Sequence, residues 1–446
     1  MALSRVLKVR QTFPRPRVGD IDEALNAEWG KEGIGSSIRP GMEVAITAGS
    51  RGIADIAPVV RGLVRLVRDA GASPFIIPAM GSHGGATAEG QVKILASLGV
   101  TEEFCGAPIR SSMEVVEIGT TPHGMPVYVD RHAHGADGVI AVARVKAHTD
   151  FRGPVESGLH KMLTIGLGKH KQALAVHALG LPGLRDHMAE VGHHVAQSGH
   201  VLFGVAIVEN GYEESAVIEA IPPKLFRERE EALLKRWFEI GPRLPIEDIE
   251  ILLVDRMGKN YSGSGMDTNV VGRMFSGVEV PSPRVKTLIV SGLTDESHGN
   301  ATGMGLADLT TKRLFDRIDF AATNENVETS TFLDAAKVPM VRADDRDALR
   351  VAIRCNWGVP AEETRFVRIP NTLHLEYVVL SENLLQEAID AAGVEPVGEP
   401  APLEFGPDGY LTPFDGGETA GSRHEPWDEV DDVPRDRDGA RTDALV

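Results

Sequence analysis

Histidine is unevenly distributed along this chain of 446 residues. Twelve of its 15 histidines fall between His83 and His200. Imidazole takes up or releases a proton near neutral pH, and it is a common ligand of transition metals. The same stretch holds Lys161 among closely spaced glycines, where a long cationic side chain has little packing purpose. We therefore expect acid–base or metal chemistry in this part of the chain.

Three candidate residues, Arg51, His83 and His148, each come after a predicted strand. His83 lies in a Gly-rich turn that precedes a predicted helix, where the helix N-terminus favours anions. Arg51 follows the preceding strand, and His148 follows the next one. In open α/β sheets, ligands bind in the crevice beyond the carboxyl ends of the strands. His177, sixteen residues after Lys161, is expected in a helix near the same crevice.

The elements that must position these residues indicate the α/β class. Short runs rich in Val and Ile alternate with longer helical patterns, which is typical of βαβ units and a largely parallel sheet. The predicted strands are Glu43–Thr47, Pro74–Pro78, Gly138–Val142, Val201–Val208, Ile249–Val254, Val285–Val290 and Leu375–Leu380. The predicted helices are Ile53–Ala70, Thr87–Leu98, Pro182–Ala196, Leu225–Phe238, Asn326–Ala335 and Glu382–Ala392.

A linker is predicted at Gly241–Pro245, after a charged helix. It divides the chain into an N-terminal α/β domain (1–240), which contains the candidate catalytic and ligand residues, and a C-terminal α/β domain (241–395). Residues 396–446 are predicted to form a flexible acidic tail, because Glu395–Val446 holds 14 acidic and four basic residues with few aliphatic ones. Such a segment buries too little apolar surface to offset its ordering entropy. The expected architecture is two Rossmann-like domains with the active site in the cleft between them.

Composition excludes several classes of protein. The net charge of −18 argues against a nucleic-acid partner. No apolar run approaches the roughly 18 residues that a membrane span needs, and the N-terminus has no long apolar stretch of the kind found in secretory signals. Two cysteines cannot build a disulfide framework or a Cys-rich zinc site, so we expect a cytoplasmic protein.

Common catalytic motifs are absent from the sequence. There is no His-Glu-x-x-His zinc motif, no Gly-x-Ser-x-Gly elbow and no strand that leads into a Gly-x-Gly-x-x-Gly turn. The segment Gly166–His170 lacks the glycine and the Ser or Thr that a P-loop requires. These absences argue against ordinary NAD, ATP and serine-hydrolase chemistry.

The pattern of turns resembles the nickel-dependent lactate racemase (LarA) family, whose cofactor is the nickel-pincer nucleotide. Three segments carry the resemblance, and they stand in the family's order: Gly81–Thr87, Ala147–Phe151 and Ser157–Met162. The spacing from Lys161 to His177 is also that of the family, and Ser50-Arg51-Gly52 matches an arginine turn. The resemblance covers about residues 40 to 310.

The resemblance implies a role for each matched residue. His83 and His148 would be the two catalytic acid/bases, and Lys161 would bond covalently to the nickel-pincer nucleotide. His177 would ligate the Ni²⁺, and Arg51 would hold the substrate carboxylate. The family fold implies a racemase or epimerase of a 2-hydroxy acid that works by reversible hydride transfer to the cofactor. Cofactor-biosynthesis proteins would then be partners.

Departures from the family pattern bear on the substrate. The lactate enzyme's substrate-contacting lysine in the second domain has no counterpart at 267–273, where Arg273 is the available cation. Ala48 and Gly49 replace an Asp-His pair, and the loop after His148 is longer and adds Asp150 and Arg152. The expected substrate is therefore a larger or more polar 2-hydroxy acid than lactate.

Other interpretations remain open at this point. The cofactor could serve other alcohol or 2-hydroxy acid redox chemistry. The His-rich region could be a nickel storage or delivery module, or the protein could be a hydrolase that uses a plain divalent ion. A lysine among glycines favours covalent cofactor attachment over storage. The remaining histidines of interest are expected on helix faces or in loops: His160, His170, His187, His193 and His194.

Overall fold

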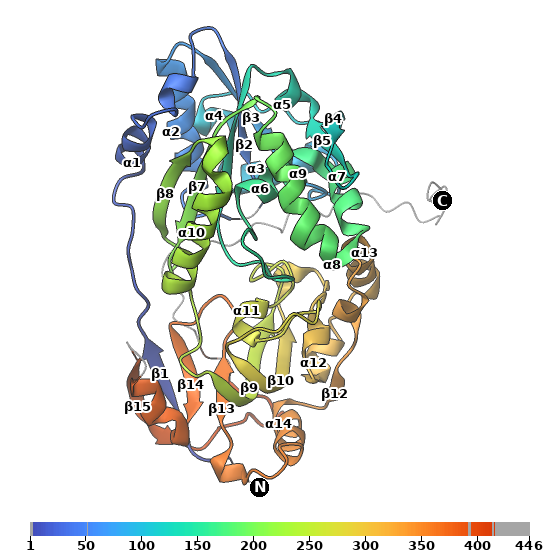
Figure 1. The fold of residues 1–446 in the computed structure, drawn as a ribbon. Coiled ribbons are helices and arrows are strands. Elements are labelled where there is room, and N and C mark those ends of the chain that lie inside the picture. Colours follow the sequence, from blue (N-terminus) through green and yellow to red (C-terminus); the bar gives the residue numbers. More distant parts are fainter. Residues whose placement is uncertain (1–2, 51, 391–393, 413, 415–446) are drawn as a thin grey trace.

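Two β-sheets organise the chain in the computed structural model, which describes residues 3–50, 52–390, 394–412 and 414. The first has the order β3-β2-β6-β7-β8, and its first four strands are parallel. Its strands are β2 (Glu43–Ala48), β3 (Ser73–Pro78), β6 (Gly138–Arg144), β7 (Val201–Glu209) and β8 (Ser215–Ile221). The predicted α/β class is confirmed, and Figure 1 shows the two sheets in separate halves of the molecule.

The strands of the first sheet are apolar on both faces because helices cover both faces. Val44 and Ile46 point into one core while Ala45 points into the other, as the pleat requires. One face is covered by α1 (Ile21–Trp29), α2 (Ile56–Asp69) and α3 (Ala88–Ser97). The other is covered by α6 (Leu159–Lys161), α7 (Leu167–His177), α9 (Met188–Ala196) and α10 (Phe226–Ile240).

Shorter elements complete this half of the molecule. A hairpin of β4 (Val115–Thr120) and β5 (Pro126–Asp130) packs beside α7. Two π-helical segments, η2 (Met162–Gly166) and η3 (Gly183–His187), stand directly before α7 and α9. The other short helices are η1 (Gly35–Ser37), α4 (Glu102–Cys105), α5 (Arg131–Gly135), α8 (Gly180–Pro182) and η4 (Pro223–Leu225).

The second sheet is mixed, with the order β12-β11-β10-β9-β13-β14-β1-β15. Its strands are β1 (Val6–Gln11), β9 (Asp248–Met257), β10 (Arg284–Leu293), β11 (Leu309–Thr311), β12 (Met340–Arg342), β13 (Phe366–Ile369), β14 (Tyr377–Ser381) and β15 (Val394–Ala401). The strands from β12 to β13 in this order are parallel, and the last three pairings are antiparallel.

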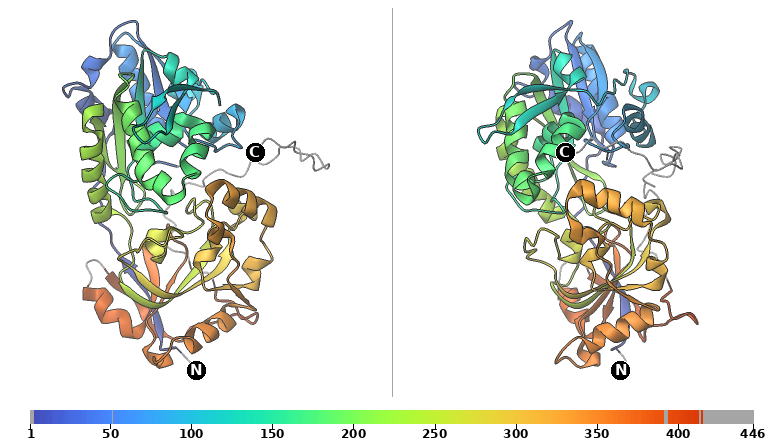
Figure 2. Two further views of the ribbon diagram at one scale, coloured as in Figure 1. Left: turned by 45° about the vertical axis from the view of Figure 1, so that its right-hand side comes forward. Right: turned by 90° about the vertical axis from the view of Figure 1, so that its right-hand side faces the viewer.

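Helices also cover both faces of the second sheet, as the turned views of Figure 2 show. They are α11 (Thr268–Val271), α12 (Lys312–Phe315), α13 (Phe320–Ser330), α14 (Asp345–Arg354) and α15 (Leu385–Asp390). The helix predicted at Asn326–Ala335 is shifted: α13 ends at Ser330, where Thr331 adopts a left-handed φ of 65°. Within the described residues, no helix is both long and apolar enough to cross a membrane.

The predicted division of the chain needs two corrections. β1 lies within the predicted N-terminal domain of 1–240, yet it pairs with β14 and β15 in the second sheet. The predicted tail begins at residue 396, yet β15 extends to Ala401, and Leu411 is buried in the core of the second half. Residues 415–446, the rest of the predicted tail, lie outside the described part of the chain. The second half therefore contains both the first strand and the last strand of the described chain.

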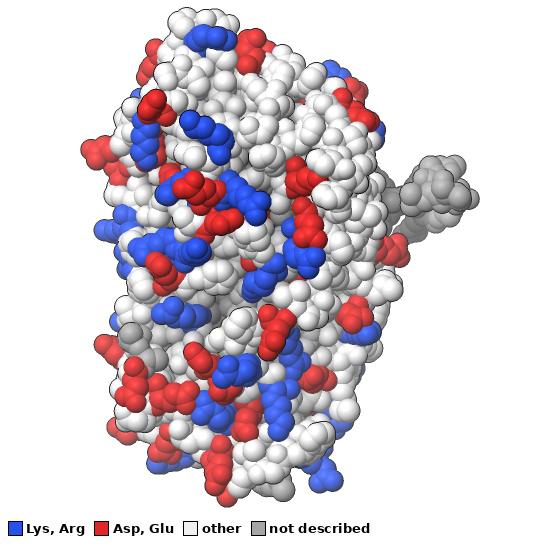
Figure 3. All heavy atoms as spheres, viewed as in Figure 1, with Lys and Arg blue, Asp and Glu red and all other residues white. Residues whose placement is uncertain are grey.

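Charged side chains of both signs are interspersed over the face shown in Figure 3. Charged residues of the described chain often form ion pairs, such as the exposed pair of Arg284 with Asp248. Exposed pairs of this kind contribute roughly 0–1 kcal/mol each to stability. This face presents no extended area of a single sign.

Candidate active site

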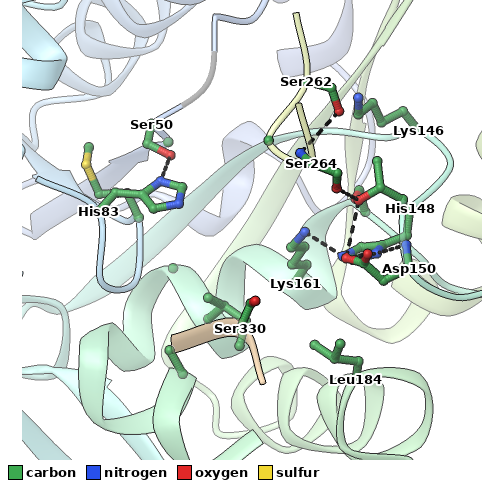
Figure 4. Close-up of a pocket in the computed structure, with 18 of the residues that line it drawn as sticks. Ser50, His83, Lys146, His148, Asp150, Lys161, Leu184, Ser262, Ser264 and Ser330 are labelled. Carbon is green, nitrogen blue, oxygen red and sulfur yellow. Dashed lines mark hydrogen bonds and ion pairs between the residues drawn. The ribbon is translucent and has the colours of Figure 1, made fainter. Parts of the chain in front are cut away.

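The candidate site is a cavity of about 380 Å³ between the two halves of the molecule. Turns and helices of the first half supply one wall, and loops of the second half supply the other. The cavity brings together His83, His148, Lys161 and His177 from separate segments of the chain. Figure 4 shows His83 facing this space from one side and His148 with Lys161 from another. Arg51 is not among the described residues, although its neighbour Ser50 lines the cavity.

His83 lies in the turn between β3 and α3, as predicted. Its Nδ1 is hydrogen-bonded to the hydroxyl of Ser50, which follows β2. The side-chain amide of Gln91 in α3 donates to the carbonyl oxygens of Gly81 (3.0 Å) and His83 (3.3 Å). Gly84 has a φ of 69°, and a Cβ there would lie 2.6 Å from the backbone nitrogen of Gln91, so this turn requires glycine. These contacts hold the His83 imidazole just beyond the carboxyl end of β3.

His148 is buried in the loop that follows β6. Its backbone N–H donates to Glu156 (2.6 Å), and the backbone N–H of Asp150 donates to its ring Nδ1 (3.0 Å). Because Nδ1 accepts, the neutral ring carries its proton on Nε2, which lies 2.9 Å from Nζ of Lys161. This hydrogen bond then requires the Lys161 amine to accept, which fits an uncharged lysine.

Burial and nearby cations keep His148 neutral. Burial is the main cause that lowers the pKa of His148 well below its usual value, and repulsion from charge on Lys161 and Lys146 lowers it further. Protonation of either His148 or Lys161 therefore disfavours protonation of the other.

Lys161 lies on a helix that begins at a buried carboxylate. Glu230 of α10 accepts hydrogen bonds from the backbone N–H groups of Leu159 and His160, and it pairs with the His160 ring. An anion at this position suits the positive end of the helix. His160 was expected on an exposed helix face or in a loop, but it is only 2% exposed because Glu230 holds it inside. The π-helical η2 follows directly, a feature often found at functional sites.

His177 is the last residue of α7, and it lines the cavity. Its Nδ1 has no hydrogen-bond partner within the described structure. Burial is the main cause that lowers the pKa of His177, with a further decrease from the charge of Lys161, while a backbone hydrogen bond with Ser330 raises it. An unpaired buried nitrogen on a neutral imidazole is what a metal ligand requires before the metal binds.

The second half contributes a polar wall that the sequence analysis largely missed. Lys259 lines the cavity directly after β9, and its Nζ donates to the Gly263 carbonyl and to Asn326 (both 2.8 Å). A lysine of the second half therefore reaches the site, although none was expected at 267–273. Its position just beyond the carboxyl end of a predicted strand is the signal that could have identified it. Ser264 also lines this wall and donates to Thr149 (3.0 Å).

Two arginines expected to meet the substrate have other partners. Arg273 donates to the carbonyl oxygen of Leu306 (2.8 Å) and pairs with Asp308 (2.8 Å) outside the cavity lining. Arg152 donates to the His148 carbonyl (2.9 Å) and contacts Asn269 across the two halves. Arg273 therefore supports the second half from within, and Arg152 holds the loop that carries His148.

A buried cation supports the His83 turn from below. Lys169 is fully buried, and its Nζ lies 3.2 Å from Oδ2 of Asp130 and 3.0 Å from the side-chain oxygen of Gln91. It also donates to the carbonyl oxygen of Pro78 at the end of β3. Gln91 in turn holds the His83 turn, so a chain of contacts joins Asp130 to His83. Burial lowers the pKa of Lys169, and the Asp130 carboxylate opposes that shift.

Substitution of Lys169 by methionine should strongly destabilise the protein. The change leaves the buried Asp130 carboxylate without its cation, and loss of one partner of a buried pair costs about 3–5 kcal/mol. The midpoint and slope of urea unfolding would measure the effect. The double variant Lys169→Met/Asp130→Asn should be less destabilised than the sum of the two single changes. Lys171→Met, an exposed lysine two residues along α7, is the matched control, and a loss as large as that of Lys169→Met would contradict the assignment.

Comparison with known proteins finds a family match for the first half of the chain. Residues 3–188 match the family described as the lactate racemase N-terminal domain. This part of the chain is therefore similar to that domain, as the order of its turns indicated. The matched range contains His83, His148, Lys161 and His177.

One solved structure is similar to a longer part of this chain. The lactate racemase apoprotein from Thermoanaerobacterium thermosaccharolyticum is similar, with 12% sequence identity and a TM-score of 0.48. The similarity covers 82% of this chain and 98% of that one. A search of curated proteins gave no match.

Proposed function

We propose that the protein is a racemase or epimerase of a 2-hydroxy acid that depends on a nickel-pincer nucleotide. The observation that carries the proposal is the convergence of His83, His148, Lys161 and His177 on one cavity. They come from separate segments of the region that matches the lactate racemase N-terminal domain. Two histidines that face one space from different turns suit a reaction that must give and take a proton at two positions.

The residues of the cavity fit this cofactor. His177 offers one buried, unpaired nitrogen, which suits a metal ion that arrives with its other donor atoms already in place. Lys161 is hydrogen-bonded in a way that fits the neutral amine, the form that can make a covalent bond. We assign Lys161 as the covalent attachment residue and His177 as the protein's nickel ligand. When bound, the cofactor supplies an acceptor for hydride from the substrate carbon.

The protein's own contribution is to orient the substrate and move its hydroxyl proton. His83, with Nδ1 hydrogen-bonded to Ser50, and His148, with Nδ1 bonded to the Asp150 N–H, each present Nε2 for this exchange. One histidine would take the hydroxyl proton of the substrate on one face of its carbon, and the other would return a proton to that oxygen from the opposite face. Two such groups on opposite faces allow the configuration to invert. Covalent use of Lys161 removes the amine that contacts His148, which makes His148 Nε2 available to the substrate.

The lining of the cavity supports a substrate more polar than lactate. Its second-half wall carries Lys259, Asn260 and Ser262, while Lys146 faces the same cavity from the first half. Gly49 lines the cavity too, and a Cβ there would lie 3.2 Å from the methyl carbon of Met162, so a larger residue would fill part of the cavity. Amide, hydroxyl and ammonium groups recognise hydroxyl or carboxylate substituents that lactate lacks. The proposed substrate is a sugar acid or a hydroxy diacid.

A panel of chiral 2-hydroxy acids would test the substrate class. We expect kcat/KM on cofactor-loaded protein to be higher for sugar acids or hydroxy diacids than for lactate, by about tenfold or more. A site that hydrogen-bonds a substituent discriminates strongly against analogues that lack it. Lys259→Met should lower kcat/KM for the sugar acids or hydroxy diacids more than it lowers kcat/KM for lactate. A ratio at or below one would contradict the substrate proposal and favour lactate itself.

A further inference from the structure

A second group of metal-binding side chains lies outside the cavity lining. It consists of His123, His187 and Glu190, the one group of three or more His, Cys, Asp or Glu residues in the described chain whose ligand atoms lie close enough to share an ion. His123 lies in the turn between β4 and β5. His187 ends η3, and Glu190 is in the first turn of α9. The catalytic proposal uses none of these residues.

The distances within this group are those of a metal site. His123 Nδ1 lies 2.8 Å from Oε1 of Glu190, and His187 Nδ1 lies 3.3 Å from its Oε2. The three ligand atoms all lie within 4.8 Å of one another. Ligands about 2.0 Å from a tetrahedral zinc ion are about 3.3 Å apart; the His187–Glu190 distance equals this value, and the His123–Glu190 distance is shorter and must open when an ion enters. The carboxylate stands between the two imidazoles in place of an ion.

The surroundings keep the ligands in place. The side chains of His187 and Glu190 are each 20% exposed and lie one helical turn apart, whereas that of His123 is 73% exposed. Two ligands are thus fixed on one helix, and the third can adjust from the hairpin.

The donor chemistry selects the class of ion. Two imidazole nitrogens and one carboxylate oxygen suit Zn²⁺ and neighbouring first-row transition metals, whereas Mg²⁺ and Ca²⁺ prefer oxygen ligands alone. We propose that His123, His187 and Glu190 form a zinc site that joins the β4–β5 hairpin to the start of α9. The site has three protein ligands, which leaves a fourth position for water.

An ion at this site would act on the wall of the cavity. η3 runs from Gly183 to His187, and its Leu184 lines the cavity. Fixing His187 to the hairpin therefore restrains the segment that carries Leu184. This consequence does not depend on which cofactor or substrate occupies the cavity.

Zinc binding to the chelator-treated full chain tests the proposal. The bound metal would be counted after equilibrium dialysis, and the affinity would be measured by isothermal titration. The variant His123→Ala/His187→Ala should bind one Zn²⁺ fewer per chain than the parent protein. Replacement of the exposed His123 alone by glutamine should weaken the affinity for that ion by about tenfold or more. The fold should remain intact, because the His123 side chain packs little.

A matched control is available elsewhere on the surface. The rings of His134 and His200 lie 5.6 Å apart, both residues are exposed, and they belong to no such group of ligand atoms. The variant His134→Ala/His200→Ala should keep the zinc stoichiometry of the parent. Zinc held by the cavity histidines would be unaffected by either double change. Equal stoichiometry and affinity in the parent, the His123→Gln variant and both double variants would overturn the proposal.

Discussion

Replacing His83 or His148 by alanine should abolish interconversion of the substrate enantiomers while the cofactor stays bound. General acid–base catalysis by one side chain contributes about 10²–10⁴ in rate, and each face of the substrate carbon needs its own group. We therefore expect kcat/KM to fall by about that factor in each variant. Neither residue is assigned to hold the cofactor, so its mass and absorbance should be retained.

The two variants should also differ in direction. If each histidine serves one face, exchange of the substrate hydrogen should persist from one enantiomer in His83→Ala and from the other in His148→Ala. Mass spectrometry of labelled substrate would measure it. His134→Ala, an exposed histidine outside the cavity lining, is the matched control and should have parental activity. Near-parental interconversion in either site variant would make that histidine structural.

The second large effect concerns Lys161. Protein produced together with the cofactor pathway should carry a nucleotide-sized mass increment, and Lys161→Arg should lack it completely. Arginine keeps a long basic side chain at this position, but its guanidinium stays protonated and is a poor nucleophile. Intact-protein mass spectrometry gives this result without any knowledge of the substrate. It also separates an enzyme with a covalent cofactor from a nickel storage protein, which has no need of the bond.

Other cavity lysines provide the controls for this experiment. Lys146 and Lys259 both line the cavity but are not assigned to the covalent bond. Lys146→Met and Lys259→Met should therefore keep the mass increment. An increment that persists in Lys161→Arg but disappears in either control would move the attachment to that lysine and refute our assignment.

The sequence was sufficient to predict the strands that carry the site. β2, β3 and β6 are short apolar runs because helices cover both faces of their sheet, and such runs are recognisable without a partner. Because these strands are parallel, the turns that follow them lie at the same edge of the sheet. His83 and His148 were therefore predicted at the edge of the sheet, which is where the structure has them.

Interactions between distant parts of the chain could not be predicted in this way. β1 pairs with strands near the other end of the chain, and β15, rich in Glu and Pro, forms at the edge of its sheet, where proline is tolerated. The charge pattern showed Arg273 as a cation, but Asp308 and three backbone carbonyls, brought together by folding, occupy its guanidinium. His160 is inside for a similar reason, since Glu230 lies 70 residues further along the chain.

The position of β1 imposes an order on folding during synthesis. This strand leaves the ribosome long before its two neighbours, β14 and β15, which begin at Tyr377 and Val394. At about 5–20 residues per second, β1 waits roughly 20–70 s for a partner. The first sheet, built from residues 43–221, is complete long before then. Leu7 and Val9, buried in the finished protein, therefore stay exposed on the nascent chain until the second half is nearly complete.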